Sequence, residues 1–105
     1  MSGSASIAGS SLLRRIALAL EESKPERGQL HVSVARTPTW EKRAPNSEES
    51  VLVRWLCWSI ADGGRGIVAP EFEVLHPDVT AERLREDLPA LFPQLEVIVD
   101  NDVEG

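Results

Sequence analysis

Residues 51–60 read Val-Leu-Val-Arg-Trp-Leu-Cys-Trp-Ser-Ile, and this run decides the fold. Half of its residues are β-branched or aromatic, the types that are enriched in strands. Its apolar residues fall on both alternating faces, a pattern typical of a strand in the middle of a sheet. The run therefore predicts a central strand, Val51–Ile60.

A hairpin turn is predicted directly after this strand. Residues 62–66, Asp-Gly-Gly-Arg-Gly, include glycines that tolerate the positive φ of tight turns. They lead into a second arm, Ile67–Leu75, in which Pro70 indicates an edge strand, a bulge or the start of the paired segment. Alternation places the apolar residues of this arm on one face and its carboxylates on the other: Val68, Phe72 and Val74 against Glu71 and Glu73.

The residues before the central strand predict a helix, a strand and a long loop. A serine at position 10 or 11 caps a helix that runs to about Ser23 and has one apolar stripe. Past this helix, alternation predicts a strand over residues 29–36. Residues 37–50 contain two prolines, five charged residues and Trp40, and are expected to form a surface loop.

A second helix and a last strand complete the predicted elements. Thr80 is placed to cap the helix, whose leucines recur at helical spacing. Pro89 lacks an amide hydrogen and clashes with the preceding turn, so the helix is expected to kink or break near Asp87. Leu95–Val99 alternates as a strand, and residues 101–105 form an acidic tail.

The fold class follows from the order of these elements, α-β-β-β-α-β. A chain of 105 residues with 42% apolar residues has the size and composition of one globular domain. Each helix has one apolar stripe to bury, so the simplest packing is a four-stranded, mainly antiparallel sheet with both helices on one face. We predict a single α+β domain over residues 11–100, preceded by a flexible segment, residues 1–10.

Charge and composition limit the partners of this domain. Seventeen acidic and eleven basic residues give a formal net charge of −6, which repels nucleic acid and anionic membranes. The N-terminus does not read as a secretory signal and no apolar run approaches the length that spans a bilayer, so a cytoplasmic location is expected. The basic residues are nine Arg and two Lys, a bias that suggests a bacterial or phage source.

The residue types that carry chemistry are few and scattered. Cys57 lies within the apolar strand, where a free cysteine behaves as a small buried hydrophobe. His31 falls on the polar side of a strand and His76 precedes a proline, so neither has the spacing of a metal site. Residues 63–66 lack the Lys-Ser/Thr of a phosphate-binding loop. We therefore expect no enzyme activity, no metal and no cofactor.

Two known families share parts of this element order. The opening αβββα resembles the outline of a double-stranded RNA binding domain, which needs basic residues at the start of its second helix. Residues 80–87 have mixed charge there, which argues against that function. The longer order αβββαβ resembles the outline of type III secretion chaperones, small acidic dimers that hold segments of effector proteins. That likeness is one of element order, and it implies a protein partner.

Tryptophan marks two candidate binding surfaces, because it is over-represented at interface hot spots. Trp40 lies in the predicted loop beside Lys42 and Arg43, and folding back onto the core is favoured over exposure to a partner. Trp55 and Trp58 fall on opposite faces of the central strand, so one is expected in the core and the other on the open sheet face. Unless the segment with Ile7 covers it, that tryptophan lies in an apolar patch with a polar rim, as interfaces do. Its predicted neighbours are Ile67, Leu75 and Ile98, interleaved with His31, Glu71, Glu73 and Glu96.

The leading hypothesis is a non-enzymatic protein-binding module that acts through the open sheet face and the Trp40 loop. Adaptor, chaperone-like and inhibitor roles are alternatives within it, and so is a homodimer. A different hypothesis is an anti-CRISPR-like inhibitor from a phage or mobile element that mimics nucleic acid. Its acidic surface would combine Glu71, Glu73, Glu96, Asp100, Asp102 and Glu104. A further alternative is a structural subunit of a phage particle.

Overall fold

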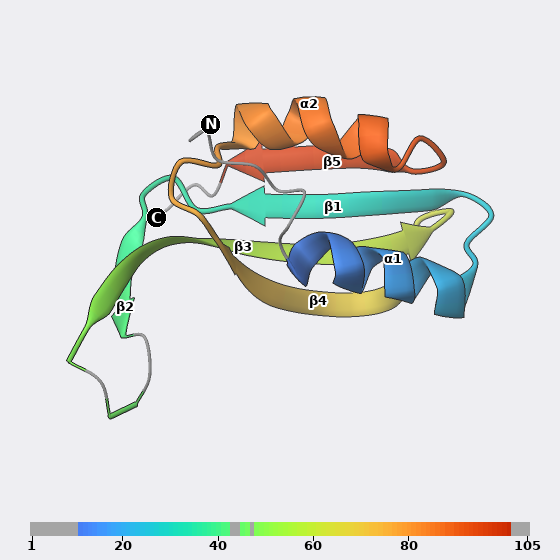
Figure 1. Cartoon of the computed structure of the whole chain (residues 1–105). Coiled ribbons are helices and arrows are strands. Elements are labelled where there is room, and N and C mark those ends of the chain that lie inside the picture. The colour runs from blue at the N-terminus through green and yellow to red at the C-terminus, as the bar shows by residue number, and fades with distance from the viewer. Residues whose placement is uncertain (1–10, 43–44, 47, 102–105) are drawn as a thin grey trace.

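The computed structural model describes residues 11–42, 45–46 and 48–101, which form an α+β fold with two helices and five strands (Figure 1). The predicted fold class is confirmed, and the element order has one strand more than expected. In chain order the elements are α1 (Ser11–Ser23), β1 (Gly28–Val34), β2 (Thr39–Lys42), β3 (Ser50–Asp62), β4 (Arg65–Leu75), α2 (Ala81–Leu91) and β5 (Glu96–Asn101).

The long strand β3 organises the sheet, as its sequence predicts. It pairs antiparallel with β4, with β1 and, through its first residues, with β2. The last strand, β5, lies beside β1 and runs parallel to it. The sheet is therefore mixed: three of its strand pairings are antiparallel and one is parallel. The reason is the helical crossover α2, which lets β5 run in the same direction as β4 and hence as β1.

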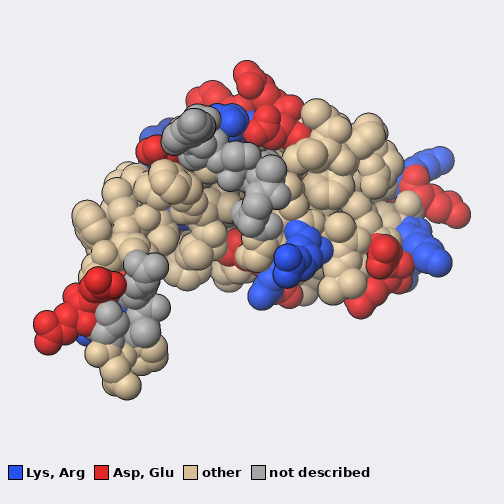
Figure 2. Space-filling model, in the orientation of Figure 1, with Lys and Arg blue, Asp and Glu red and all other residues tan. Residues whose placement is uncertain are grey.

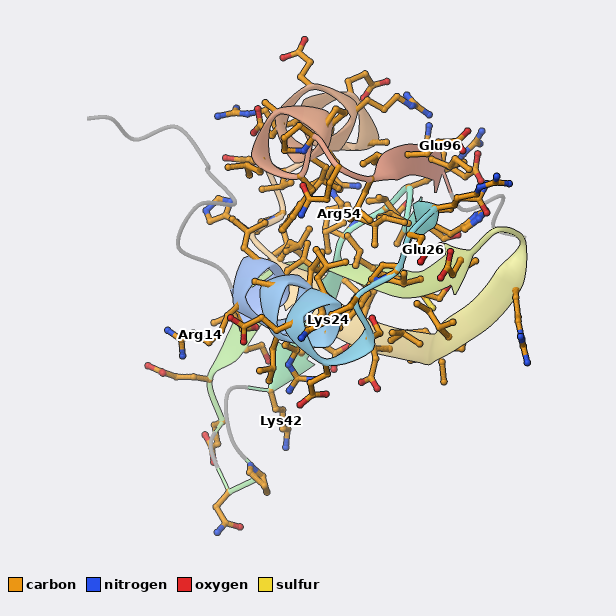
Figure 3. All side chains as sticks on the ribbon, turned by 90° about the vertical axis from the view of Figure 1, so that its right-hand side faces the viewer. Arg14, Lys24, Glu26, Lys42, Arg54 and Glu96 are labelled. Carbon is orange, nitrogen blue, oxygen red and sulfur yellow. The ribbon has the colours of Figure 1, made fainter. Side chains whose placement is uncertain are left out.

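Both helices lie on one face of the sheet, as Figure 3 shows. Alternate residues of β1 and β3 point toward them, and a single buried cluster joins these strands to the helices. Every second residue of β1 points toward the helices and is buried, whereas His31 and Ser33, which alternate with these residues, are exposed. The principal members of the core are Leu12 and Ile16 of α1, Leu30, Val32 and Val34 of β1, Leu56, Trp58 and Ile60 of β3, and Leu84 and Leu88 of α2.

The helix α2 begins as predicted but does not break. The hydroxyl oxygen of Thr80 accepts a hydrogen bond from the amide of Arg83 at 3.3 Å and so caps the first turn. Pro89 lies inside the helix, which continues to Leu91. The amide of Phe92 donates to the carbonyl of Leu88 at 2.8 Å, so hydrogen bonding resumes after the proline. Burial of the apolar stripe outweighs the one bond that the proline removes.

Residues 37–50, predicted as a loop, contain the strand β2. Thr39–Lys42 pairs antiparallel with Ser50–Val53, which makes β3 longer than the predicted Val51–Ile60. This two-stranded arm projects from the body of the molecule, beyond the two helices (Figure 1). The described residues accordingly have an elongated envelope of 45 × 30 × 28 Å.

Two irregularities in β4 change which residues share a face. Trp58 pairs with Glu71 and Ile60 with Val68, so two steps along β3 correspond to three along β4. A second shift follows between Ile60 and Ala61. Pro70 lies within the longer segment, in agreement with the prediction of a bulge or an edge strand. Each extra residue reverses the alternation of side chains that follows it.

Some predictions concern parts of the chain outside the described residues. These are the flexible segment 1–10 with Ile7, the side chain of Arg43, and the acidic residues Asp102 and Glu104. At the described end, β5 extends to Asn101, two residues beyond the predicted strand.

Candidate functional site

The structure places Trp55 and Trp58 on opposite faces of β3, as their spacing predicts. Trp58 is the one in the core, with 2% of its surface exposed. Trp55 is exposed on the face that the two helices leave open. Its indole nitrogen donates a hydrogen bond to Oε2 of Glu41 at 3.1 Å, which ties the sheet to the arm. The sequence left the choice between the two tryptophans open, and the helix positions decide it.

A group of apolar side chains surrounds Trp55 on the open face. We call it the open-face patch and define it as Trp55, Cys57, Phe72, Val74 and Ala35. Trp55 pairs with Val74 and Cys57 with Phe72 across β3 and β4, and the amide of Ala35 donates to the carbonyl of Trp55. Side chains paired in this way lie about 5 Å apart at Cβ. Phe72 is 68% exposed, which is unusual for a phenylalanine on a strand, and Val74 is also exposed.

The open-face patch is hollowed near its centre. A shallow depression of about 270 Å³ is lined by Ser33, Ala35, Trp55, Leu56, Cys57 and Phe72. Its apolar walls and its position between exposed aromatic rings suit the insertion of a side chain from another molecule.

Acidic residues and one histidine border the open-face patch. Ser33 pairs with Asp100 and His31 with Ile98, so Asp100 and His31 share the open face. Glu41 lies there because it accepts from Trp55. Glu96, which accepts from the side-chain amide of Gln29 at 3.1 Å, lies on the same face but at its far end, where Gln29 pairs with Ala61. Among the described strand positions of this face, none is Lys or Arg. The rim therefore has negative charge.

The structure contradicts the predicted place of Glu71 and Glu73. Both lie on the helix face of β4, where the side chain of Glu73 is only 6% exposed. Its carboxylate forms an ion pair with Nε of Arg15 at 2.9 Å and accepts from the hydroxyl of Ser11 at 3.0 Å. Glu71 lies 3.6 Å from the same guanidinium. The shifts in β4 are the cause, because they reverse the alternation after Pro70.

The same reversal explains which apolar neighbours of Trp55 were missed. Phe72 and Val74 were expected on the face of Val68, whereas Val68 points to α1 and the other two lie on the open face. Of the predicted neighbours, Leu75 is in the core and Ile67 lies against α1, while Ile98 is half-buried on the open face. The presence of Pro70 between Val68 and Phe72 was the available signal.

Trp40 is exposed and does not fold back onto the core. It lies on β2 with 67% of its surface exposed, and it pairs with Leu52. Alternation places both on the face opposite to Glu41 and Trp55, so Trp40 is not part of the open-face patch. Lys42 is exposed beside it on the same strand. The core does not reach Trp40 because the arm lies beyond the helices (Figure 1).

Cysteine and histidine, the residue types considered above for catalysis and metal binding, lie in different segments of the described chain. Cys57 is a free, half-buried thiol within the open-face patch. His76 accepts a hydrogen bond from the amide of Asp78 at Nδ1, at 3.1 Å. Within residues 11–42, 45–46 and 48–101, no group of three or more His, Cys, Asp or Glu side chains is arranged to hold a metal ion. No described helix has the length and apolar character needed to cross a bilayer.

Comparison with protein-family models, with curated proteins and with solved structures finds no match to this chain. The candidate site is therefore interpreted from its own geometry: exposed apolar side chains, a depression between them and an acidic rim.

Proposed function

We propose that this protein is a non-enzymatic binding module whose open-face patch docks another protein. The observation that supports this most is the exposure of Phe72 beside Val74 and Trp55 on a face without helices. Exposing three large apolar side chains together has a cost in water, of roughly 25 cal/mol for each Å² of apolar surface. Contiguous patches of this kind are typical of interaction sites.

The charge of the rim supports a partner with basic residues around an apolar centre. Glu41 and Asp100 border the patch and Glu96 lies further along the same face, without Lys or Arg at the described strand positions of that face. A partner that offers an aliphatic or aromatic side chain flanked by Lys or Arg complements both features. A second copy of this chain would instead place carboxylates opposite carboxylates. We therefore propose a different protein as the partner, in an adaptor, chaperone-like or inhibitor role.

Nucleic-acid mimicry has less support. That hypothesis needs the predicted carboxylates on one surface, and Glu71 and Glu73 lie on the helix face whereas Asp100 lies on the open face. On the helix face, Lys and Arg side chains lie among the Asp and Glu side chains (Figure 2). An acidic stripe that imitates a phosphate backbone requires a single sign of charge over a long surface.

Replacement of Phe72 and Val74 by threonine tests the proposal. Threonine retains strand propensity, so Phe72→Thr/Val74→Thr removes the apolar surface and leaves the fold intact. The control is Leu91→Gln, because Leu91 is an exposed apolar residue of α2, away from the patch. Each tagged variant is used to capture proteins from the source cell, and the protein recovered with the wild type is then purified and titrated.

The proposal expects one protein that binds the wild type and Leu91→Gln and binds the double variant about tenfold or more weakly. Its affinity should fall with added salt, because the rim is charged. Equal binding by all three variants would exclude the open-face patch. A wild-type dimer in light scattering that the double variant dissociates would assign the face to a second copy of the chain instead.

A further inference from the structure

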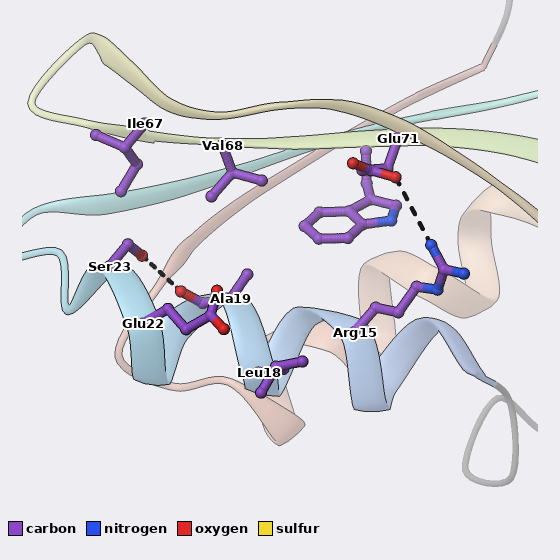
Figure 4. A pocket seen from close by; sticks show the side chains of 9 residues that line it. Arg15, Leu18, Ala19, Glu22, Ser23, Ile67, Val68 and Glu71 are labelled. Carbon is purple, nitrogen blue, oxygen red and sulfur yellow. Dashed lines mark hydrogen bonds and ion pairs between the residues drawn. The ribbon is translucent and has the colours of Figure 1, made fainter.

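A groove between α1 and β4 lies on the other side of the sheet from the open-face patch. It has a volume of about 550 Å³ and is bounded by Leu18 and Ala19 of α1 and by Ile67 and Val68 of β4 (Figure 4). Leu18 stands at its lip and is half exposed. The volume falls within the range of about 300–1,000 Å³ that is usual for sites of small molecules.

One buried donor in this groove has no acceptor. Trp58 lines the groove, and its indole N–H makes no hydrogen bond although the nitrogen is sealed from solvent. A buried donor without a partner loses its hydrogen bond to water and gains none in return, which destabilises the fold. Native proteins retain few such groups, and each calls for an explanation. The equivalent group of Trp55 is satisfied by Glu41, so the two tryptophans differ in this respect.

Charges at the two ends of the groove limit what could supply the acceptor. Glu22 lies at one end and Glu71 at the other, where it pairs with Arg15 (Figure 4). Arg15 is also engaged by Glu73 on its other side. Among the described residues that line the groove, Arg15 has the only guanidinium, and its charge is already neutralised by the carboxylates of Glu71 and Glu73. The carboxylates of Glu22 and Glu71 repel an anion.

The pair of Arg15 and Glu71 lies at one end of the groove (Figure 4). Their atoms are 3.6 Å apart and both side chains are about half exposed. Exposed ion pairs of this kind contribute little to stability. Glu71 is therefore only weakly held at this end of the groove.

We propose that this groove binds a small neutral molecule with an apolar body and one carbonyl or hydroxyl oxygen, which accepts from the indole of Trp58. The apolar body lies against Leu18, Ala19 and Val68. The site is independent of the open-face patch, because β3 and β4 separate the two.

The indole N–H signals of the ¹⁵N-labelled protein provide the test, with cyclohexanone as the probe. Trp40→Phe and Trp55→Phe assign two of the three signals, so the core residue Trp58 is identified without being changed. Cyclohexanone is expected to move the Trp58 signal downfield and to leave the other two in place. Cyclohexanecarboxylate, which has a similar body and a negative charge, is expected to have no effect.

Two leucine substitutions locate the binding. Ala19→Leu fills the groove and should abolish the shift, whereas Ala17→Leu, on the exposed side of the same helix, should preserve it. A Trp58 signal that does not respond to cyclohexanone, or that responds equally in Ala19→Leu, would overturn the proposal. So would exchange of the Trp58 N–H with solvent as fast as that of Trp40, because water would then already be its acceptor.

Discussion

Replacing Arg54 by lysine should destabilise the protein by about 2 kcal/mol, although the charge is retained. The guanidinium of Arg54 donates to three backbone carbonyls in two other segments of the chain. Nη1 contacts the carbonyls of Ala35 and Arg36 at 2.9 and 2.8 Å. Nε and Nη2 contact the carbonyl of Pro77 at 3.1 and 2.7 Å. Arg54 thereby holds the start of the arm against the connection that leads into α2.

The magnitude follows from the number of carbonyls that lose a donor. A hydrogen bond to a charged group contributes about 1.5–3 kcal/mol net. A lysine has one nitrogen on a flexible stem and can reach one of the two segments, so about one such contribution is lost and water satisfies part of the rest. For a domain of this size, about 2 kcal/mol corresponds to a fall in Tm of roughly 8–16 °C.

Urea unfolding followed by tryptophan fluorescence and circular dichroism measures the change in the free energy of unfolding. Arg14→Lys, on the exposed face of α1, is the matched control and should lie within about 0.5 kcal/mol of the wild type. Hydrogen exchange adds a local reading, since Arg54→Lys should lower the protection of the β2 amides. Equal stability of Arg54→Lys and the wild type would show that these carbonyls do not depend on the guanidinium fork.

Two further predictions concern Arg15 and Trp40. Arg15→Met should lower the free energy of unfolding by about 2 kcal/mol. This is less than the roughly 3–5 kcal/mol lost when a fully buried pair is broken, because Glu73 is buried while Arg15 is 56% exposed. Recovery of the urea midpoint in the double variant with Glu73→Gln would confirm the cause, and no loss in the single variant would refute it. Trp40→Ala should change stability by less than about 1 kcal/mol, far from the cost of roughly 3–5 kcal/mol for truncating a core aromatic residue, and a large fall in Tm would show that the ring is packed.

Alternation and capping made much of the fold predictable from sequence. Val51–Ile60 was identified as a central strand because its residue types and both of its faces fit one. The opposite positions of Trp55 and Trp58 follow directly from the period of two. Thr80 marks the start of α2 because its side chain satisfies an amide of the first turn. These signals are local, and they hold whatever the remainder of the chain does.

The features that were missed depend on partners far along the chain. Thr39–Lys42 has no alternating apolar pattern and becomes a strand only because Ser50–Val53 lies beside it. The face of Phe72 depends on how many residues β4 inserts opposite β3, which no local pattern specifies. The continuation of α2 through Pro89 depends on burial of Leu84 and Leu88 against the sheet. The sequence therefore predicts one of Trp55 and Trp58 on the open face without choosing between them, and it assigns Phe72 to the wrong face.

The exposed apolar surface also follows from the lengths of the elements. The 13 residues of β3 extend about 43 Å at 3.3 Å per residue, whereas the 13 residues of α1 extend about 20 Å at 1.5 Å per residue. A helix layer of that length covers the part of β3 that pairs with β1 and cannot also cover the arm. Val51, Leu52 and Val53 nevertheless keep the apolar character of a central strand; Val51 and Val53 share the face of Trp55, whereas Leu52 and Trp40 share the opposite face. We propose that Val51 and Val53 extend the interface of the open-face patch along the arm, whereas Trp40 and Leu52 lie outside it.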